Sequence, residues 1–336
     1  MKKSLIIFFF FLLSASLLGQ NSGAETSSPK QTNVQTPNQD EAEVDAGFTA
    51  YKNGKYAEAH KLFLKNADWS ARAKNMLGFM CISGKGGRQD DKEAVNWFRK
   101  SAEQGDVTGQ KKLGDAYLDG AGVKKDDKEA AKWYRKAAEQ NNDKAQYELA
   151  EMYRKGQGGL PKDIVEAAKW YLRSAEQDNP EGQMVIGGMY QNGLGVKKDD
   201  QEAIKWFRKS AEAGNAMAQN ALGFMYKNGF AVTQDYEEAL KWLQKAAEQD
   251  DAQAQANLGI MYNNGYGVKQ DYMMAAKLYR MLAEQGYDVA QTNLGSMYLD
   301  GTGVAKDDKE AIKWYRKAAA QGNKQAREKL KELGKD

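Results

Sequence analysis

The sequence repeats itself with a period of about 36 residues over most of its length. A branched aliphatic residue followed by a small one recurs once in every period, at Leu77-Gly78, Leu113-Gly114, Leu149-Ala150, Ile186-Gly187, Leu222-Gly223, Leu258-Gly259 and Leu294-Gly295. One step is a residue longer, because Gly158-Gly159 stands where the other periods have a single glycine. A fixed period of this length predicts a linear stack of similar units rather than one globular core.

The first half of each period predicts an amphipathic helix that ends at a glycine. Ala218, Leu222 and Met225 lie at helical spacing in one such segment. A glycine can adopt the left-handed conformation that commonly terminates a helix. The terminal glycines are Gly84, Gly120, Gly156, Gly193, Gly229, Gly265 and Gly301. A second glycine, such as Gly122, follows two positions later in every unit except the one with Ala231.

The second half of each period predicts another helix, which begins with an aspartate followed three residues later by a glutamate. Asp126 and Glu129 are one such pair. Two carboxylates can also form a glycosidase site, but a pair that recurs in nearly every unit favours helix capping. We expect the aspartate to accept backbone N–H groups and the glutamate to reach back to the start of the helix. The tryptophans at a fixed position further along, including Trp133, Trp206 and Trp314, are expected to lie in the core.

The combined pattern A-Q-x-x-L-G-x-M-Y-x-x-G-x-G-V-x-x-D-x-x-E-A-x-K-W resembles the Sel-1-like repeat of the tetratricopeptide-like class. The resemblance implies an all-α fold, a right-handed α/α superhelical solenoid of helix-turn-helix repeats. Seven units are expected, at 71–106, 107–142, 143–179, 180–215, 216–251, 252–287 and 288–323. Residues 44–70 resemble a tetratricopeptide capping unit, and 324–336 are expected to form a C-terminal capping helix that covers the last apolar face.

The N-terminus has the composition of a signal peptide. Lys2 and Lys3 precede the apolar run Leu5 to Leu13, which is short for a membrane span. We expect residues 1–24 to be removed after Ala24 and the protein to be periplasmic or secreted. An uncleaved anchor is the alternative, and it would be the chain's only contact with a membrane. Residues 25–43 contain few apolar side chains, which predicts a disordered leader.

Charge and composition exclude several functions. The net charge of +3 falls to +1 without Lys2 and Lys3, and charges of both signs are interleaved, so no nucleic acid is expected as a partner. One histidine, His60, cannot form a multi-histidine metal site. Cys81 is the only cysteine, so no internal disulfide can form, and its position matches that of a core tyrosine in other units. We expect no cofactor, no metal, no catalytic residues and a monomeric protein.

The function implied by the resemblance is that of a scaffold, adaptor or regulator that binds another protein. Two alternatives remain open. A β-lactamase-type hydrolase has been described for cysteine-rich relatives of this repeat family, but this chain lacks their cysteine pairs. A binder of cell-wall glycan would need accessible aromatic residues, whereas the fixed register of the tryptophans indicates the core. The sequence does not identify the partner.

The units also differ from one another in a way that suggests a binding surface. Two positions in the first helix, four residues apart, vary most among the units, and the resemblance places this helix on the concave side of the solenoid. Large apolar residues occur there at Phe79, Tyr147, Met184, Phe224 and Ile260. We expect them to contact a segment of the partner, and the alternative is that they pack between helices. Leu113, Leu222, Trp133, Trp206, Trp314, Gly120, Gly122 and Gly229 are expected to hold the stack together.

Overall fold

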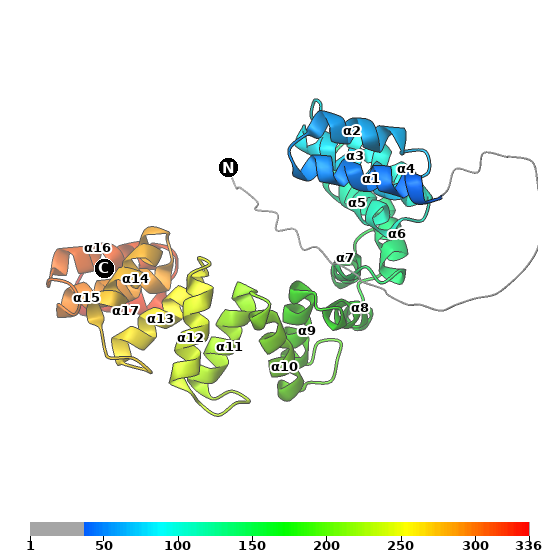
Figure 1. Ribbon diagram of the computed structural model, residues 1–336. Helices are drawn as coiled ribbons and strands as arrows, with labels where there is room; N and C mark the ends of the chain where they lie inside the picture. The colour runs from blue at the N-terminus through cyan, green and yellow to red at the C-terminus, as the bar shows by residue number, and fades with distance from the viewer. Residues whose placement is uncertain (1–36, 336) are drawn as a thin grey trace, which may run out of the picture.

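The structure is a computed structural model that describes residues 37–335, and this part of the chain folds into 17 α-helices with no strand. Each helix packs mainly against the helices that precede and follow it in the sequence. The helix pairs follow an arc from the N-terminal units, through α8 to α10, to α16 at the other end (Figure 1). The predicted all-α solenoid is confirmed. The expected signal peptide, 1–24, lies outside the described residues.

Each of the seven units contributes two helices. The first helices are α3 (Ala71–Ser83), α5 (Val107–Asp119), α7 (Asp143–Lys155), α9 (Pro180–Asn192), α11 (Ala216–Asn228), α13 (Ala252–Asn264) and α15 (Asp288–Asp300). The second helices are α4 (Asp91–Glu103), α6 (Asp127–Glu139), α8 (Ile164–Glu176), α10 (Asp200–Glu212), α12 (Tyr236–Ala247), α14 (Tyr272–Glu284) and α16 (Asp308–Ala320).

The ends of the stack are closed by three further helices: α1 (Pro37–Lys52) and α2 (Tyr56–Lys65) before the first unit and α17 (Lys324–Glu332) after the last. Helix α1 begins before the expected boundary at 44, so 37–43, which the sequence assigned to a disordered leader, are helical, and the rest of that expected leader lies outside the described residues. The early turns lack apolar residues but are held by charges, because Lys65 Nζ lies 2.5 Å from Glu43 Oε1 and Arg72 Nη1 lies 3.1 Å from Glu41 Oε2.

Both helix ends in a unit follow from short local signals. Each first helix ends at its glycine in the left-handed conformation, as at Gly120 with φ 73° and Gly229 with φ 68°. Asp126 caps the following helix by accepting the backbone N–H groups of Lys128 and Glu129. The glutamate, however, does not reach back as expected. The Asp126 N–H instead donates to the Tyr117 carbonyl at 2.9 Å, because the two helices of the unit meet there.

The glutamates do not cap the helix and instead bind side chains of their own helix. Glu129 accepts from Trp133 Nε1 at 3.2 Å and from Lys132 Nζ at 3.1 Å. Glu238 does the same with Trp242 Nε1, at 3.0 Å. In these two units the glutamate therefore fixes the tryptophan ring rather than the helix terminus, whereas Nε1 of Trp170, Trp206 and Trp314 has no hydrogen-bond partner.

The recurrent glycine after the core leucine allows the two helices of a unit to pack closely. A Cβ atom added to Gly114 would lie 2.7 Å from the Tyr134 ring, which is 1% exposed. The same relation holds between Gly78 and Phe98 and between Gly295 and Tyr315. Alternation of small residues and rings thus builds a continuous core, as close packing requires.

A second glycine joins neighbouring units. Gly122 has φ 72°, and a Cβ atom there would lie 2.1 Å from the Asp91 carbonyl oxygen at the start of α4 in the preceding unit. Any side chain at this position would collide with backbone. Ala231 occupies the equivalent position in the fifth unit with φ 56°, a conformation that is unfavourable for alanine.

Candidate functional site

The seven first helices each have an exposed side, and we call these sides together the first-helix face. Two pairs of adjacent first helices contact each other directly, α3 with α5 and α11 with α13. The face includes the variable positions singled out in the sequence.

The residues expected to hold the stack together lie in its interior or in its turns. Leu113 and Leu222 are fully buried. Trp133 and Trp314 are 8% and 6% exposed, whereas Trp206 is half-buried. Each ring is covered by a cation from the next helical turn, at 4.2 Å for Lys136 over Trp133 and Lys317 over Trp314, and at 4.7 Å for Lys209 over Trp206.

The residues expected to bind a partner are not equally accessible. Phe79 and Tyr147 are half-buried and pack edge-on against the core rings Phe98 and Tyr171 of their own units, with centroids 5.3 and 5.5 Å apart. These two side chains therefore serve the core as well as the surface.

The other three lie further along the first-helix face. Met184 is half-buried between two core clusters, and Ile260 is also half-buried. Phe224 is 42% exposed, and its ring lies 5.8 Å from the ring of Phe230, which is 53% exposed. Phe224 and Phe230 form the most accessible aromatic pair associated with this face, so they are its strongest candidates for contact with a partner.

The N-terminal part of the face carries charges that pair with one another. Lys111 Nζ lies 2.8 Å from Asp115 Oδ2, and Tyr134 Oη donates to Asp115 Oδ1 at 2.9 Å. Burial raises the pKa of Glu148 in the same region, with the nearby Lys111 opposing the shift. Opposite charges on α5 and α7 are thus largely satisfied within the protein.

Glu151 is the centre of this network. Its carboxylate accepts two hydrogen bonds from Arg154, at 3.0 and 2.6 Å, and one from the Tyr171 hydroxyl, and it pairs with Lys155 at 2.8 Å. Burial acts to raise the pKa of Glu151, but the hydrogen bonds from Arg154 and Lys155 prevail and lower it to about 2. The carboxylate is therefore ionised at all physiological pH values.

The middle of the face is almost free of charge. Helices α9, α11 and α13 together contain two charged residues, Glu181 and Lys227. Lys227 Nζ donates to Asn257 Oδ1 at 2.7 Å, and Asn257 Nδ2 donates to Asn220 Oδ1 at 3.1 Å. Burial lowers the pKa of Lys227, and no carboxylate within the described residues pairs with it. This region therefore contains an ordered ammonium group without a counter-ion, beside the accessible ring of Phe224.

Hollows occur between adjacent first helices at equivalent positions near both ends of the stack. The first, of about 350 Å³, is lined by Ile82, Lys112 and Asp115 among others. The second, of about 280 Å³, is lined by Asn263, Asn293 and Ser296 among others. The hollow near the N-terminus is therefore lined by several charged groups, whereas the one near the C-terminus is lined by amide and hydroxyl groups and a single carboxylate, Asp300.

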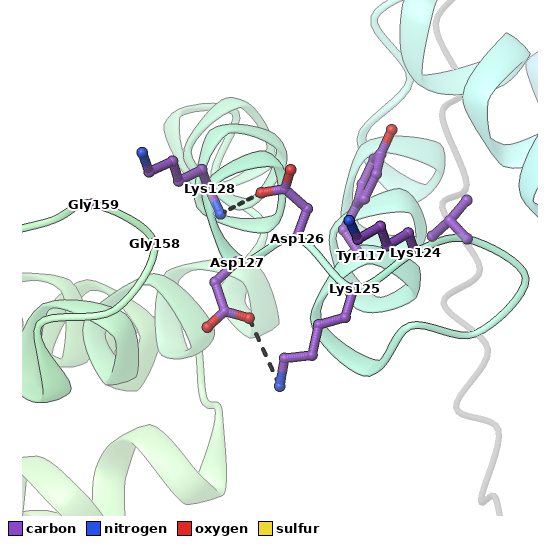
Figure 2. Close-up of a pocket in the computed structure, with 9 residues that line it drawn as sticks. Tyr117, Lys124, Lys125, Asp126, Asp127, Lys128, Gly158 and Gly159 are labelled. Atoms are coloured by element: carbon purple, nitrogen blue, oxygen red, sulfur yellow. Dashed lines mark hydrogen bonds and ion pairs between the residues drawn. The ribbon is translucent and has the colours of Figure 1, made fainter.

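A larger hollow of about 770 Å³ lies between the loop that precedes α6 and the loop with the inserted Gly158-Gly159 (Figure 2). Figure 2 shows Lys125 reaching Asp127, 3.8 Å away, and Asp126 accepting the backbone N–H of Lys128 at 2.9 Å. Asp126 is thus engaged as a helix cap, whereas the buried Oδ1 of Asp127 has no hydrogen-bond partner and only the distant Lys125 ammonium near it, so the hollow is the space between two loops.

The described residues offer little chemistry. No group of three or more histidine, cysteine or acidic residues between 37 and 335 is placed to hold a metal ion. Cys81 is 7% exposed, and burial raises its thiol pKa to about 11, with Glu93 and Asp90 adding to the effect. The thiol is therefore protonated at neutral pH, which makes it a poor nucleophile. None of the helices in this range is long and apolar enough to cross a membrane.

A ladder of glutamines between units was not recognised in the sequence. Gln110 donates to the Ala102 carbonyl of the preceding second helix, and Gln140 Nε2 donates to Gln110 Oε1 at 2.8 Å. Gln146 and Gln177 repeat the pattern one unit later. The signal was present, because a glutamine follows the first small residue in six of the seven units, but its partners lie on other helices.

The arrangement defines the class of the protein: an α-helical repeat scaffold with an exposed first-helix face. The model of the Sel1 repeat matches residues 71–106, 107–142, 143–179, 180–215, 216–251, 252–287 and 288–323. The chain belongs to the Sel1 repeat family. Sel1 repeat solenoids are typically non-catalytic, and repeats of this kind commonly bind other proteins. No curated protein matches the chain.

Two solved structures resemble the whole stack. One is c5321, a protective antigen of uropathogenic Escherichia coli strains with an SLR fold, which is 34% identical with a TM-score of 0.67. The match covers 88% of this chain and 72% of that one. The other is a Sel1 repeat protein from Oxalobacter formigenes, 31% identical with a TM-score of 0.62, covering 88% of this chain and 89% of that one.

Proposed function

We propose that this chain is an exported scaffold that binds another protein on its first-helix face. Sel1 repeat proteins generally act as protein-interaction scaffolds. The stacking of the units uses the leucines, alanines and ring residues of both helices, and it leaves one side of each first helix uncovered. This surface is not buried by packing between the helices, and its side chains differ from unit to unit. Such a surface suits recognition of one partner.

The accessible pair Phe224 and Phe230 carries this proposal. Both rings remain about half exposed although the stack around them is complete. Large aromatic side chains in such positions tend to contribute much of the binding energy at protein interfaces. Phe79 and Tyr147 supply further apolar area, but their contacts with Phe98 and Tyr171 give them a second role.

Export is proposed from the N-terminal sequence alone. Lys2, Lys3 and the apolar run Leu5 to Leu13 support a signal peptide that ends near Ala24. The test is N-terminal sequencing of the protein recovered from each cell fraction and from the medium. Mature chains that begin after Ala24 outside the cytoplasm support export, and an intact Met1 in the cytoplasmic fraction contradicts it.

The binding surface is tested by placing a photo-crosslinking amino acid at position 224 and identifying the captured protein by mass spectrometry. The same capture is then attempted with a crosslinker at position 260 in the presence of Phe224→Lys. We expect one reproducible partner and its loss in the variant. A matched crosslinker at the exposed position Lys132 on α6 serves as the control, since it lies on a second helix. Equal capture from Lys132 would contradict the proposal.

A further inference from the structure

Lys227 is an ordered positive charge that the protein leaves without a counter-ion. Its ammonium group is held by Asn257 at 2.7 Å, and among the described residues no acidic side chain pairs with it. A partly buried charge is unfavourable unless it is paired. A carboxylate brought by a ligand would remove this penalty and gain a charge-assisted hydrogen bond.

The surroundings of Lys227 indicate which kind of carboxylate fits. Lys227 Nζ lies 5.2 Å from the centre of the Phe224 ring, and the exposed Phe230 ring lies beside it. An apolar group of the ligand can therefore pack on the rings while a carboxylate meets the ammonium. In an extended chain, residues two apart point to the same side and are separated by about 6.8 Å. An acidic and an apolar residue in that relation match the two subsites.

The groups next to the ammonium are amides rather than charges. Asn220 and Asn257 flank the ammonium, and the hollow with Asn263 and Asn293 continues the face toward the C-terminus. An amide side chain can both donate to and accept from a peptide group. The site is open in both directions along the stack, so it suits a segment that passes through it better than a chain end.

We propose that the first-helix face at α11 and α13 binds an extended, otherwise uncharged segment of the partner, with one Asp or Glu side chain on Lys227 and an apolar side chain two residues away on Phe224 and Phe230. This inference rests on the proposed function and specifies the chemistry of the partner segment. The half-buried amide of Asn220 contacts the segment's backbone, whereas Asn257, which is 3% exposed, holds the Lys227 ammonium group in place.

Arg154 provides a matched control within the chain. It occupies the same position in the third unit as Lys227 does in the fifth, but its guanidinium already binds Glu151 at 2.6 and 3.0 Å. A cation at this position is therefore not sufficient for the proposed site. The absence of an internal carboxylate is what makes Lys227 available.

The test uses arrays of 12-residue peptides, acetylated and amidated at their ends, with randomised uncharged flanks around a Glu-x-Phe or Phe-x-Glu centre. A second set carries Gln for Glu, and a third carries Gln with a free C-terminal carboxylate. The protein from Glu25 onward, Lys227→Met and Arg154→Met are compared. The affinities of retained peptides are measured by titration calorimetry, and thermal melting verifies that each variant is folded.

We expect the unmodified protein and Arg154→Met to prefer the Glu peptides over the Gln peptides by roughly tenfold or more. Lys227→Met loses that preference. Equal binding of Glu and Gln peptides, or a preference that survives in Lys227→Met, overturns the inference. Selective binding of the free C-terminus would also overturn it.

The outcomes separate this inference from the proposed function. If peptides bind without a preference for Glu and lose binding in Phe224→Lys, that outcome supports the proposed function but contradicts the role of Lys227. If no peptide in any set is retained, both fail. A charge exchange adds a positive test, since Lys227→Glu should shift the preference from Glu-x-Phe to Lys-x-Phe peptides.

Discussion

The second and third units differ from the fifth and sixth in how they treat charge on the same surface. Helices α5 and α7 carry four and six charged residues, whereas α11 and α13 carry one between them. The charges of α5 and α7 bind one another, as in the contacts of Glu151 with Arg154 and Lys155. Lys227 on α11 has an amide as its hydrogen-bond partner.

The difference shows that units with the same backbone can differ in their surface charges. In one region the charges pair within the protein, and in the other a charge has no counter-ion. A network such as that of Glu151 stabilises the fold but leaves few free groups for a ligand. A lone ammonium beside accessible rings contributes little to folding and is available for binding. Net charge alone would not distinguish the two regions, since both are nearly neutral.

The turns of the two regions give the largest expected effect on stability. In Gly122→Ala the new methyl group would meet the Asp91 carbonyl oxygen at 2.1 Å and force a positive φ on alanine. We expect the free energy of unfolding to fall by about 3 kcal/mol, measured by urea denaturation. Neutral substitutions at the surface cost less than about 0.5 kcal/mol. A loss that small would show that neighbouring units can shift at this turn to accept a side chain.

The charge network is expected to contribute next. Glu151→Ala leaves Arg154, Lys155 and the Tyr171 hydroxyl without their acceptor. We expect a loss of about 2 kcal/mol, since the carboxylate is mostly buried but its two cations are partly exposed. The measurement is again urea denaturation, with Glu129→Ala as a more exposed control. Equal effects for the two would remove the distinction between a network and a surface pair.

The same network predicts a pH dependence. Because the folded-state pKa of Glu151 is lowered to about 2, its stabilisation is complete above the unfolded-state value of about 4.3 and is lost as pH falls through about 2. The melting temperature should therefore fall more steeply between pH 6 and pH 2 in the original protein than in Glu151→Gln. Parallel curves would mean that other carboxylates dominate acid unfolding.

The fifth unit allows the reverse of the Gly122→Ala substitution, because it already has an alanine at the equivalent position. Ala231 has φ 56° at the position of Gly122 in the second unit. Ala231→Gly relieves this conformation, and we expect a gain of about 1 kcal/mol in the free energy of unfolding, reduced by the greater freedom of glycine in the unfolded chain. Denaturation midpoints of this variant and of Gly122→Ala should move in opposite directions. Movement in the same direction would contradict the equivalence of the two turns.

The smallest effect is expected at the proposed binding site. Lys227→Met keeps the length of the side chain and removes a charge that burial disfavours, so we expect a change within about 0.5 kcal/mol. Phe224→Lys, at a side chain that is 42% exposed, should behave similarly. Thermal melting measures both. A large loss in either variant would assign the residue to the fold rather than to binding, and would remove the contrast with Glu151.

Much of the fold could be predicted because its signals are local. The aspartate caps, the left-handed glycines and the core leucines depend on contacts within a few residues, and repetition of the pattern reinforces each of them. The role of Glu129 was predicted wrongly, because the competing partner of the Asp126 N–H is a carbonyl on the preceding helix. The start of α1 was missed for a similar reason, since Glu41 and Glu43 are held by Arg72 and Lys65 from other helices.

The site was predictable only in outline. The variable positions pointed to the first-helix face, but they ranked Tyr147 with Phe224, and only packing separates a ring that contacts Tyr171 from one that remains accessible. Lys227 and Phe230 were not singled out, because neither lies at the two most variable positions. Their importance depends on Asn257, which comes from the next unit.

The sequence by itself determined the period, the two helices of each unit and the turns between them, because backbone hydrogen bonds, caps and glycine conformations involve neighbours along the chain. Only the tertiary structure decided which polar groups meet across units: Gln140 with Gln110, Tyr134 with Asp115, and Lys227 with Asn257. Those contacts depend on how far each unit is rotated against the next. That rotation is set by the summed packing of both helices, which no single motif specifies.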